Sequence, residues 1–258
     1  LQFSNLHQVM TEIELIIDLH LDNERQGPGS PQETKRALDL IRIDRSKLEK
    51  IADIGCGTGG QTLTLAQNTQ AEIIAIDLFS EFLTKLENRV QKLGLTHRIK
   101  TQTASMENLP FQPEEFDIIW SEGAIYNIGF ESGIKNWRKF LKPGGYLAVS
   151  EISWLTNSRP KTIEDYWLSQ YPQIDTVSHK IKVLESQGYV PKAHFILPPS
   201  CWLENYYIPL QQRFEAFLVK HQNSELAQNI VENEKNEIEI YQQFQDYYSY
   251  GFYIAQKQ

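Results

Sequence analysis

Residues 53–60 read Asp-Ile-Gly-Cys-Gly-Thr-Gly-Gly and lie between a short apolar run and a helix-like stretch that begins near Gln61. Glycine at this density lets the backbone turn sharply, adopt a positive φ or approach a ligand closely. A strand, a glycine loop and a helix N-terminus together are typical of a nucleotide-binding site. The sequence therefore predicts a loop that binds a nucleotide cofactor.

The spacing of these glycines leaves the kind of nucleotide open. Gly55, Gly57 and Gly60 also fit the dinucleotide spacing G-x-G-x-x-G, which is a weak signal alone. Asp53 precedes the first glycine, and Asp77 ends the next apolar run. A carboxylate at the end of the second parallel strand can accept hydrogen bonds from both ribose hydroxyls. Asp77 is therefore the predicted ribose ligand for either kind of nucleotide.

The composition favours one large domain with a small-molecule partner. The chain has 258 residues, with 25 lysines and arginines against 33 aspartates and glutamates, a formal net charge of −8. Binding a phosphate backbone needs a basic face, so we expect no nucleic acid partner. Cys56 and Cys201 lack the spacing of a disulfide framework or a zinc site, so no metal is expected. No apolar run approaches the ~20 residues that span a bilayer, and no signal pattern is seen, which predicts a cytoplasmic protein without a membrane partner.

Short apolar runs alternate with helical stretches from residue 51 onward, which predicts an α/β protein with a mostly parallel sheet. Ser80 is expected to cap the helix between the second and third runs. Residues 175–187 predict another helix. Residues 203–249, which are polar and rich in tyrosine, predict one or two long surface helices rather than a second core. The predicted strands are residues 51–54, 73–76, 99–103, 116–120, 146–150, 194–197 and 252–255.

Two further helices are predicted ahead of this alternation. Residues 5–21 have apolar side chains at helical spacing and predict an amphipathic helix. Glycines and prolines then interrupt the pattern, and Ser30 is expected to cap a new helix over residues 31–41, with Glu33 in its first turn. The segment 27–30 has two interpretations, an ordinary linker or a loop that folds over a ligand.

The order of several short motifs resembles the class I S-adenosylmethionine-dependent methyltransferases. After the loop at 53–60 come Leu-Pro-Phe at 109–111, Phe-Asp-Ile-Ile at 116–119 and Leu-Lys-Pro-Gly-Gly at 141–145. The resemblance covers roughly residues 30–255, and two of these motifs are similar to the branch that acts on small molecules. It implies a Rossmann-like, doubly wound, mostly parallel seven-stranded sheet with an antiparallel closing strand. It also implies S-adenosylmethionine as cofactor, S-adenosylhomocysteine as product and a small-molecule methyl acceptor.

The resemblance also divides the chain. Residues 1–30 are expected to form an N-terminal helix and a lid, joined to the core by a hinge of glycine and proline. Residues 31–258 would form the methyltransferase domain, with a helical insertion at about 203–249 before the last strand. A homodimer is among the expected assemblies.

Roles carried over from the family place the cofactor along the strand ends. Asp53 would orient the glycine loop or meet the methionine amino group, and Asp77 would hold the ribose hydroxyls. Ser105 stands where the family usually has an acidic residue near the adenine, and Met106 would pack against that ring. Ser121 would lie near the methionine carboxylate or the transferred methyl. The predicted cofactor-binding set is Arg25, Ser30, Asp53, Gly55, Cys56, Gly57, Gly59, Asp77, Leu78, Ser105, Met106, Glu107 and Ser121.

The chemistry of methyl transfer sets what else is needed. Transfer from a sulfonium is an in-line displacement with a neutral leaving group, so the protein mainly aligns the reacting atoms. An alcohol or ammonium acceptor also needs a base, for which Glu122 is the candidate, although it could instead be a solvated loop carboxylate. Tyr126 is a second predicted catalytic residue. Asn127, Trp154 and Tyr206 are predicted to contact the acceptor, with wall or packing roles as the alternative. Aromatic rings there would favour an aromatic or cationic acceptor.

Two other functions stay open at this point. A nicotinamide-dependent dehydrogenase would use the same glycines, although the Leu-Lys-Pro-Gly-Gly motif and the antiparallel-looking closing strands weigh against it. A protein of the same fold could also bind the cofactor without catalysis. Cofactor binding would separate the methyltransferase from the dehydrogenase, and turnover to the demethylated product would separate the enzyme from the binding protein.

Overall fold

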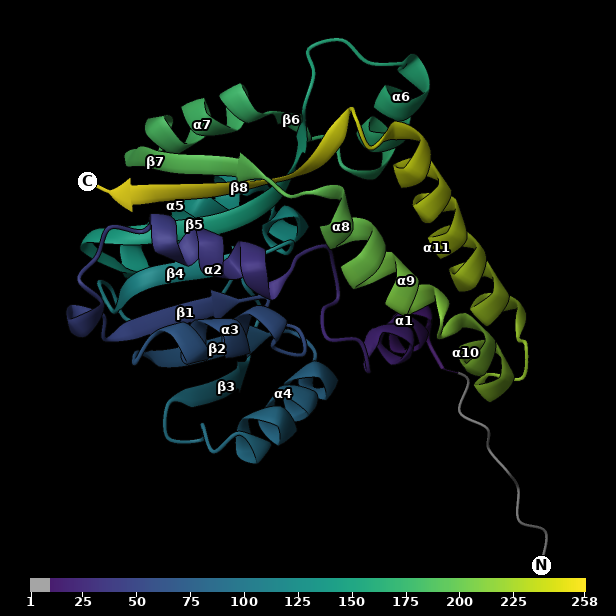
Figure 1. The fold of residues 1–258 in the computed structure, drawn as a ribbon, viewed down its shortest axis with the longest axis horizontal. Helices are drawn as coiled ribbons and strands as arrows, with labels where there is room; N and C mark the ends of the chain where they lie inside the picture. The colour runs from purple at the N-terminus through teal and green to yellow at the C-terminus, as the bar shows by residue number, and fades with distance from the viewer. Residues whose placement is uncertain (1–9) are drawn as a thin grey trace, which may run out of the picture.

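One eight-stranded sheet forms the centre of the computed structural model, which describes residues 10–258 (Figure 1). The strand order is β3-β2-β1-β4-β5-β8-β7, and the short β6 pairs with β5. β8 runs antiparallel to both of its neighbours, and the other pairs are parallel. The strands are β1 (Lys50–Ile54), β2 (Glu72–Asp77), β3 (Ile99–Thr103), β4 (Phe116–Glu122), β5 (Leu141–Trp154), β6 (Asp175–Thr176), β7 (Tyr189–Ile196) and β8 (Tyr248–Lys257).

Helices cover both faces of this sheet, because each face is apolar and must be buried. One core packs three helices against the sheet through Leu38, Leu65 and Leu86, and the other packs two helices through Trp137 and Leu184. This arrangement confirms the predicted doubly wound, mostly parallel sheet with an antiparallel strand. The helices are α2 (Pro31–Leu40), α3 (Gly60–Asn68) and α4 (Ser80–Lys92) on one face, and α5 (Phe130–Trp137) and α7 (Val177–Ser186) on the other.

Four strands differ from the prediction: β7 begins at Tyr189 rather than 194, β8 begins at Tyr248 rather than 252, and β5 and β6 differ for local reasons. β5 begins five residues early because Lys-Pro-Gly-Gly bulges from it: Phe116 pairs with Leu141, whereas Ile118 pairs with Tyr146. β6 takes the first residues of the stretch predicted as a helix over 175–187. Thr176 caps α7 there, since its hydroxyl accepts from the backbone N–H of His179 at 3.3 Å. The sheet therefore has eight strands rather than seven.

The predicted helix caps are half right. Ser30 caps α2, and its hydroxyl accepts from the backbone N–H of Glu33 at 3.1 Å. Ser80 is instead the first residue of α4, whose cap position is Phe79 with no side-chain hydrogen bond. Asp77 fixes this turn, since its Oδ1 accepts from the Phe79 N–H at 3.0 Å. Ser80 is therefore not needed as a cap.

A group of helices from both ends of the chain lies beyond the arrowheads of the parallel strands, and we name it the cap (Figure 1). α1 packs against α10 and α11 there. Of the helix predicted at 5–21, residues 5–9 lie outside the described residues, and Thr11 caps the described part. The cap consists of α1 (Glu12–His20), α8 (Pro199–Trp202), the π-helix η4 (Leu203–Tyr207), α9 (Ile208–Gln211), α10 (Phe214–Lys220) and α11 (Glu225–Phe244).

Residues 203–249 form helices without a separate second core, as predicted, but their inner side chains are not at the surface and join the core that packs on the sheet. Tyr207, Tyr241 and Tyr248 are buried against Trp202, whose indole stacks on Tyr241 at 4.5 Å between ring centroids. A tyrosine can join a core when its hydroxyl finds a partner, as that of Tyr207 does on Glu237 at 2.9 Å. The stretch therefore joins that core through residues that read as polar in composition. No helix within residues 10–258 combines the length and apolarity that crossing a membrane would take.

The remaining elements are short connections around the sheet. The helix α6 (Lys161–Gln170) joins β5 to β6. The 3₁₀ turns η1 (Arg45–Lys47), η2 (Ile125–Ile128) and η3 (Arg138–Phe140) lie in other connections.

Candidate active site

A cavity of about 400 Å³ lies at the carboxyl ends of β1, β2 and β4, the edge where open α/β sheets bind ligands. Four chain segments wall it: the stretch before α2, the glycine loop, the loop after β3 and the loop after β4. Most residues predicted to contact a ligand meet here. They are Arg25, Gly55, Cys56, Gly57, Asp77, Leu78, Ser105, Met106, Glu107, Glu122, Tyr126 and Asn127.

The glycine loop forms the floor of the cavity. Gly55 and Gly57 have φ of 74° and 55°, a region that favours glycine. A Cβ at Gly55 would collide with Ala124, and one at Gly57 would collide with the side chain of Gln26. Asp77 holds the loop from the neighbouring strand, since its Oδ2 accepts from the Gly57 N–H at 2.8 Å. The floor is therefore backbone, with one carboxylate at its edge.

Burial raises the pKa of the Asp77 carboxyl, against the opposing effect of the backbone N–H groups of Phe79 and Gly57. Its two oxygens each accept one backbone hydrogen bond, which leaves further lone pairs directed at the cavity wall. The carboxylate is thus fixed in place and remains able to accept from a ligand hydroxyl.

Asp53 and Gly59 do not line the cavity, although both belong to the loop motif. Asp53 is fully buried and accepts from the hydroxyl of Thr62 at 2.6 Å and the amide of Gln61 at 3.3 Å. Burial raises its pKa to about 7. Gly59 caps α3 with φ of 88°, where a Cβ would collide with Leu86. Both residues therefore hold the first turn of α3 against β1.

The stretch before α2 covers the loop from the cap side. Gln26 accepts from the backbone N–H of Thr58 at 2.8 Å and donates to the Thr58 hydroxyl at 3.1 Å. The Thr58 hydroxyl in turn donates to the backbone carbonyl of Asn23 at 2.9 Å. The segment 25–28 is thus hydrogen-bonded onto the glycine loop and forms a wall of the cavity.

Glu122 ends β4 and joins this wall to the sheet. Its Oε2 accepts from Nη1 of Arg25 at 2.7 Å, and only 5% of the Glu122 side chain is exposed. Its Oε1 accepts from the Thr34 hydroxyl at 2.7 Å and the indole N–H of Trp120 at 2.9 Å. The alternative of a solvated loop carboxylate is therefore wrong, since Glu122 is buried and bound by three donors.

A family model described as a methyltransferase domain matches residues 51–145, the stretch that holds the glycine loop, Asp77 and Glu122. Over this stretch, which is less than half of its length, the chain resembles methyltransferases. Methyltransferase GfsG from Streptomyces halstedii is 31% identical over 112 residues, which are 43% of this chain and 40% of GfsG. Phosphoethanolamine N-methyltransferase 3 from Arabidopsis thaliana is 27% identical over 125 residues, 48% of this chain and 24% of that enzyme. The match spans less than half of either relative.

Solved structures share the fold over nearly the whole chain. An S-adenosylmethionine-dependent methyltransferase from Geobacter sulfurreducens, in complex with S-adenosylhomocysteine, aligns with a TM-score of 0.83. It is 15% identical, and the alignment covers 95% of this chain and 98% of that one. YjhP from E. coli aligns with a TM-score of 0.83 at 16% identity, over 95% of this chain and 100% of that one. The cap is therefore part of the fold that these structures share.

The far wall of the methyltransferase cavity follows β2 and β3. Leu78 and Phe79 come from the first loop, and Phe79 packs edge-on against Phe82 at 5.8 Å between ring centroids. Ser105 and Met106 come from the second loop, which is fixed because the Met106 carbonyl accepts from the indole of Trp137 at 3.0 Å. This wall combines the apolar side chains of Leu78, Phe79 and Met106 with the polar side chains of Ser105 and Glu107.

Besides Asp53 and Gly59, four more predicted residues lie outside the cavity lining. Ser30 caps α2, and Ser121 is fully buried with an unpartnered hydroxyl. Trp154 is buried against Tyr248 beneath the guanidinium of Arg159. The fourth residue, Tyr206, lies in the π-helix η4. Contacts from these four to a ligand stay predictions.

Sequence reasoning missed several lining residues, among them Gln26, Gln61, Phe79 and Ala124. Gln61 could have been found, because it begins the helix that follows the glycine loop and so faces the same ligand. Gln26 has no local signal, since only the tertiary fold brings the stretch before α2 onto Thr58.

Proposed function

We propose that this chain transfers a methyl group from S-adenosylmethionine to a small-molecule acceptor bound in the same cavity. The observation that carries the proposal is the backbone floor at Gly55 and Gly57 beside the carboxylate of Asp77. Ala124 and Gln26 leave no room for a Cβ at these two glycines, so the loop presents backbone to the cavity that it lines. The site thus fits a nucleoside with a polar tail that runs along the loop.

The residues present suit each part of that cofactor. Asp77 would accept hydrogen bonds from the ribose hydroxyls, and the wall with Phe79 and Met106 would take the adenine. Ser105 and Glu107, in the same wall, would meet the adenine edge. The methionine part would extend along the glycine loop toward Arg25, whose guanidinium can bind a carboxylate.

The cofactor, when bound, supplies an electrophilic methyl group on a sulfonium. The chain then has to align the acceptor with that methyl and keep water out. Residues 25–28 cover the loop and serve the second purpose. Tyr126 and Asn127 line the cavity beside Glu122, where the acceptor would enter.

Glu122 has two candidate roles in this reaction. As a general base it would take a proton from the acceptor, as proposed from the sequence. As a positioning residue it would hold Arg25 and Thr34 against β4. Arg25 belongs to residues 25–28, which lie over the glycine loop and are named the cover here. Its three donors favour the positioning role, because they already occupy most of the lone pairs of the carboxylate.

Labelled transfer tests the proposed function. The purified protein is incubated with methyl-labelled S-adenosylmethionine and a metabolite extract, and the label is followed into an acceptor together with formation of S-adenosylhomocysteine. We expect both products. Calorimetric binding of a nicotinamide dinucleotide in place of S-adenosylmethionine would support the dehydrogenase instead. Binding of S-adenosylmethionine without any label transfer would support a non-catalytic binding protein.

Further predictions from the sequence remain proposals. They include a lid formed by residues 1–30, a homodimer, a cytoplasmic location and the absence of a nucleic acid partner. Light scattering would test the dimer, and a gel shift at low salt would test nucleic acid binding.

A further inference from the structure

Two carboxylates of the cap are turned toward the inside of the protein. Glu234 and Glu237 lie one turn apart on α11, in the cap (Figure 1). Oε1 of Glu234 lies 3.4 Å from Nε2 of His20 on α1, and Oε1 of Glu237 accepts from the Tyr207 hydroxyl at 2.9 Å. Glu239, two residues further along α11, is exposed. The inner face of α11 therefore holds two acidic groups close together.

His20 is the one basic group that faces these two carboxylates among the described residues, and it carries a charge only when protonated. Within residues 10–258, neither forms an ion pair with a lysine or an arginine, and Oε2 of Glu234 is buried without a hydrogen-bond partner. Burial, followed by the charge of Glu234, raises the pKa of Glu237 to about 7. Elsewhere in the chain, the buried Glu151 is paired with Lys180 at 3.1 Å. The acidic pair thus has no permanent positive charge beside it within residues 10–258.

Tyrosines connect this acidic pair to the cavity. Tyr126 lines the cavity and is 41% exposed, and the charge of Glu237 adds to the effect of burial in raising the pKa of its hydroxyl. Tyr250 is only 9% exposed, yet its hydroxyl has no hydrogen-bond partner among the described residues and lies beside Gly123, which lines the cavity. Between Tyr126 and the carboxylates there is therefore a face of tyrosine rings and an unused hydroxyl.

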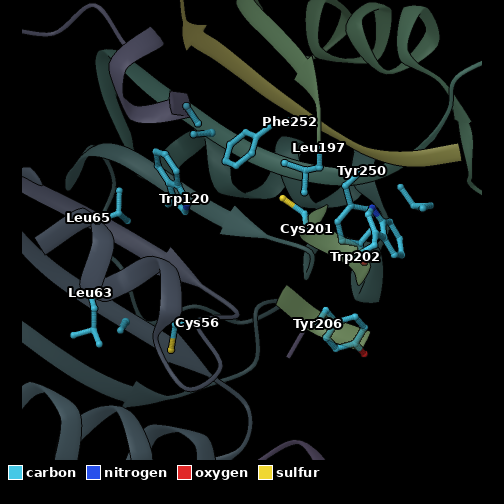
Figure 2. Close-up of a cluster of buried hydrophobic side chains, with 14 of the residues drawn as sticks. Cys56, Leu63, Leu65, Trp120, Leu197, Cys201, Trp202, Tyr206, Tyr250 and Phe252 are labelled. Atoms are coloured by element: carbon cyan, nitrogen blue, oxygen red, sulfur yellow. The ribbon is translucent and has the colours of Figure 1, made fainter. Parts of the chain in front are cut away.

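The π-helix supplies the other side of this face. Tyr206 is 8% exposed, its ring stacks with that of His20 at 6.1 Å, and it lies 5.1 Å from the ring of Tyr207. Figure 2 shows Tyr206 apart from the packed group of Trp202 and Tyr250, with its hydroxyl pointing away from them. π-helices are rare and often mark functional sites. Faces of tyrosine rings attract cations, as do carboxylates.

We propose that the methyl acceptor carries a cationic nitrogen, which binds between Tyr126 and Tyr206 against the carboxylates of Glu234 and Glu237. The inference rests on the proposed function and adds the chemical class of the acceptor. The ammonium supplies a permanent charge for the acidic pair, and its hydrogens would donate to the unpartnered Oε2 of Glu234.

Paired probes of similar shape test this inference. Benzylammonium and benzyl alcohol are titrated calorimetrically into the protein loaded with S-adenosylhomocysteine. We expect the ammonium to bind about tenfold more tightly or better, the scale of a hydrogen bond to a charged group. Glu234→Gln and Glu237→Gln should each reduce that preference, and Glu239→Gln, on the exposed side of the same helix, should keep it.

The outcomes separate this inference from the proposed function. Binding of S-adenosylhomocysteine is measured first in each variant, which also shows that the variant is folded. Failure of the parent to bind S-adenosylhomocysteine would count against the methyltransferase itself. If S-adenosylhomocysteine binds but the parent shows no preference for the ammonium, or the Gln variants keep it, the cationic acceptor is wrong and the acidic pair is a structural contact of His20 and Tyr207.

Discussion

Replacing Glu122 by glutamine tests how the cover of the cofactor site is held. The carboxylate ties Arg25 of the cover and Thr34 of α2 to the end of β4 through hydrogen bonds of 2.7 Å each. Glu122→Gln keeps the shape and one acceptor oxygen but removes the charge that faces Arg25. We therefore expect the cover to bind the sheet more weakly while the sheet itself stays folded.

The size of the effect follows from the burial of the pair. The side chains of Arg25 and Glu122 are 7% and 5% exposed, so solvent screens their interaction little. A hydrogen bond between charged groups contributes ~1.5–3 kcal/mol. If closing the cover is coupled to cofactor binding, the same free energy weakens the affinity for S-adenosylhomocysteine by about 10- to 140-fold.

The assay combines calorimetry with hydrogen exchange. S-adenosylhomocysteine is titrated into the parent, Glu122→Gln, Arg25→Gln and the double variant, so that the cycle isolates the coupling between the two residues. Backbone N–H groups of residues 23–30 should lose protection in each variant. Asp39→Asn removes the exposed ion pair with Lys35 and serves as the control, with affinity and protection unchanged.

A different pattern would refute the positioning role. If Glu122 is the general base, Glu122→Gln leaves affinity and protection unchanged, and turnover falls by an amount that shrinks as pH approaches the pKa of the acceptor. Non-zero coupling between Arg25 and Glu122, with a loss that is equal at every pH, supports positioning.

Three shorter predictions concern the cofactor, the pH dependence and the cap. Asp77→Asn keeps an acceptor for the glycine loop but should weaken S-adenosylhomocysteine binding by ~1.5–3 kcal/mol in calorimetry, and unchanged affinity would remove Asp77 as the ribose ligand. Burial raises the pKa of Asp53 to about 7, so the folded state holds its proton and the stability that this proton gives is lost as pH rises through that value. In urea unfolding, the free energy of unfolding of Asp53→Asn should then rise relative to that of the parent by up to ~1.4 kcal/mol per pH unit between about pH 4 and 7. Parallel plots of this free energy against pH for the two proteins would contradict the prediction. Trp202→Ala should destabilise the protein by ~3–5 kcal/mol in the same assay because it opens the aromatic core of the cap, and a loss under ~1 kcal/mol would show that the cap folds independently of that core.

The sheet could be predicted because its signals are local. Each parallel strand reads as a short apolar run that is bounded by turn residues, and the register then follows from burial on both faces. The errors occurred where a distant contact decides the structure. β6 exists because it lies beside the end of β5, where Ser153 pairs with Asp175, and no pattern in its own two residues indicates a strand.

The cavity lining was predicted better around the glycine loop than at Trp154 and Tyr206, which lie outside it, for the same reason. Gly55, Gly57 and Asp77 lie in strand ends and loops whose order along the chain fixes their positions in space. The roles of Arg25 and Glu122 were harder to infer, because the two lie 97 residues apart and only the fold shows that they form an ion pair. A motif therefore indicates which residues face the cofactor, but does not show which of their polar groups are already bound.

This difference bears on how acceptor specificity is encoded. The methyltransferase family model matches residues 51–145. His20 precedes this stretch in the sequence, and Glu237 follows it. The cap brings these two flanks together, since α1 packs against α10 and α11. Of the segments outside the matched stretch, residues 25–28 line the cavity directly. If the acceptor binds as proposed, against Glu234 and Glu237, changes in the cap would alter the acceptor without disturbing the glycine loop or Asp77.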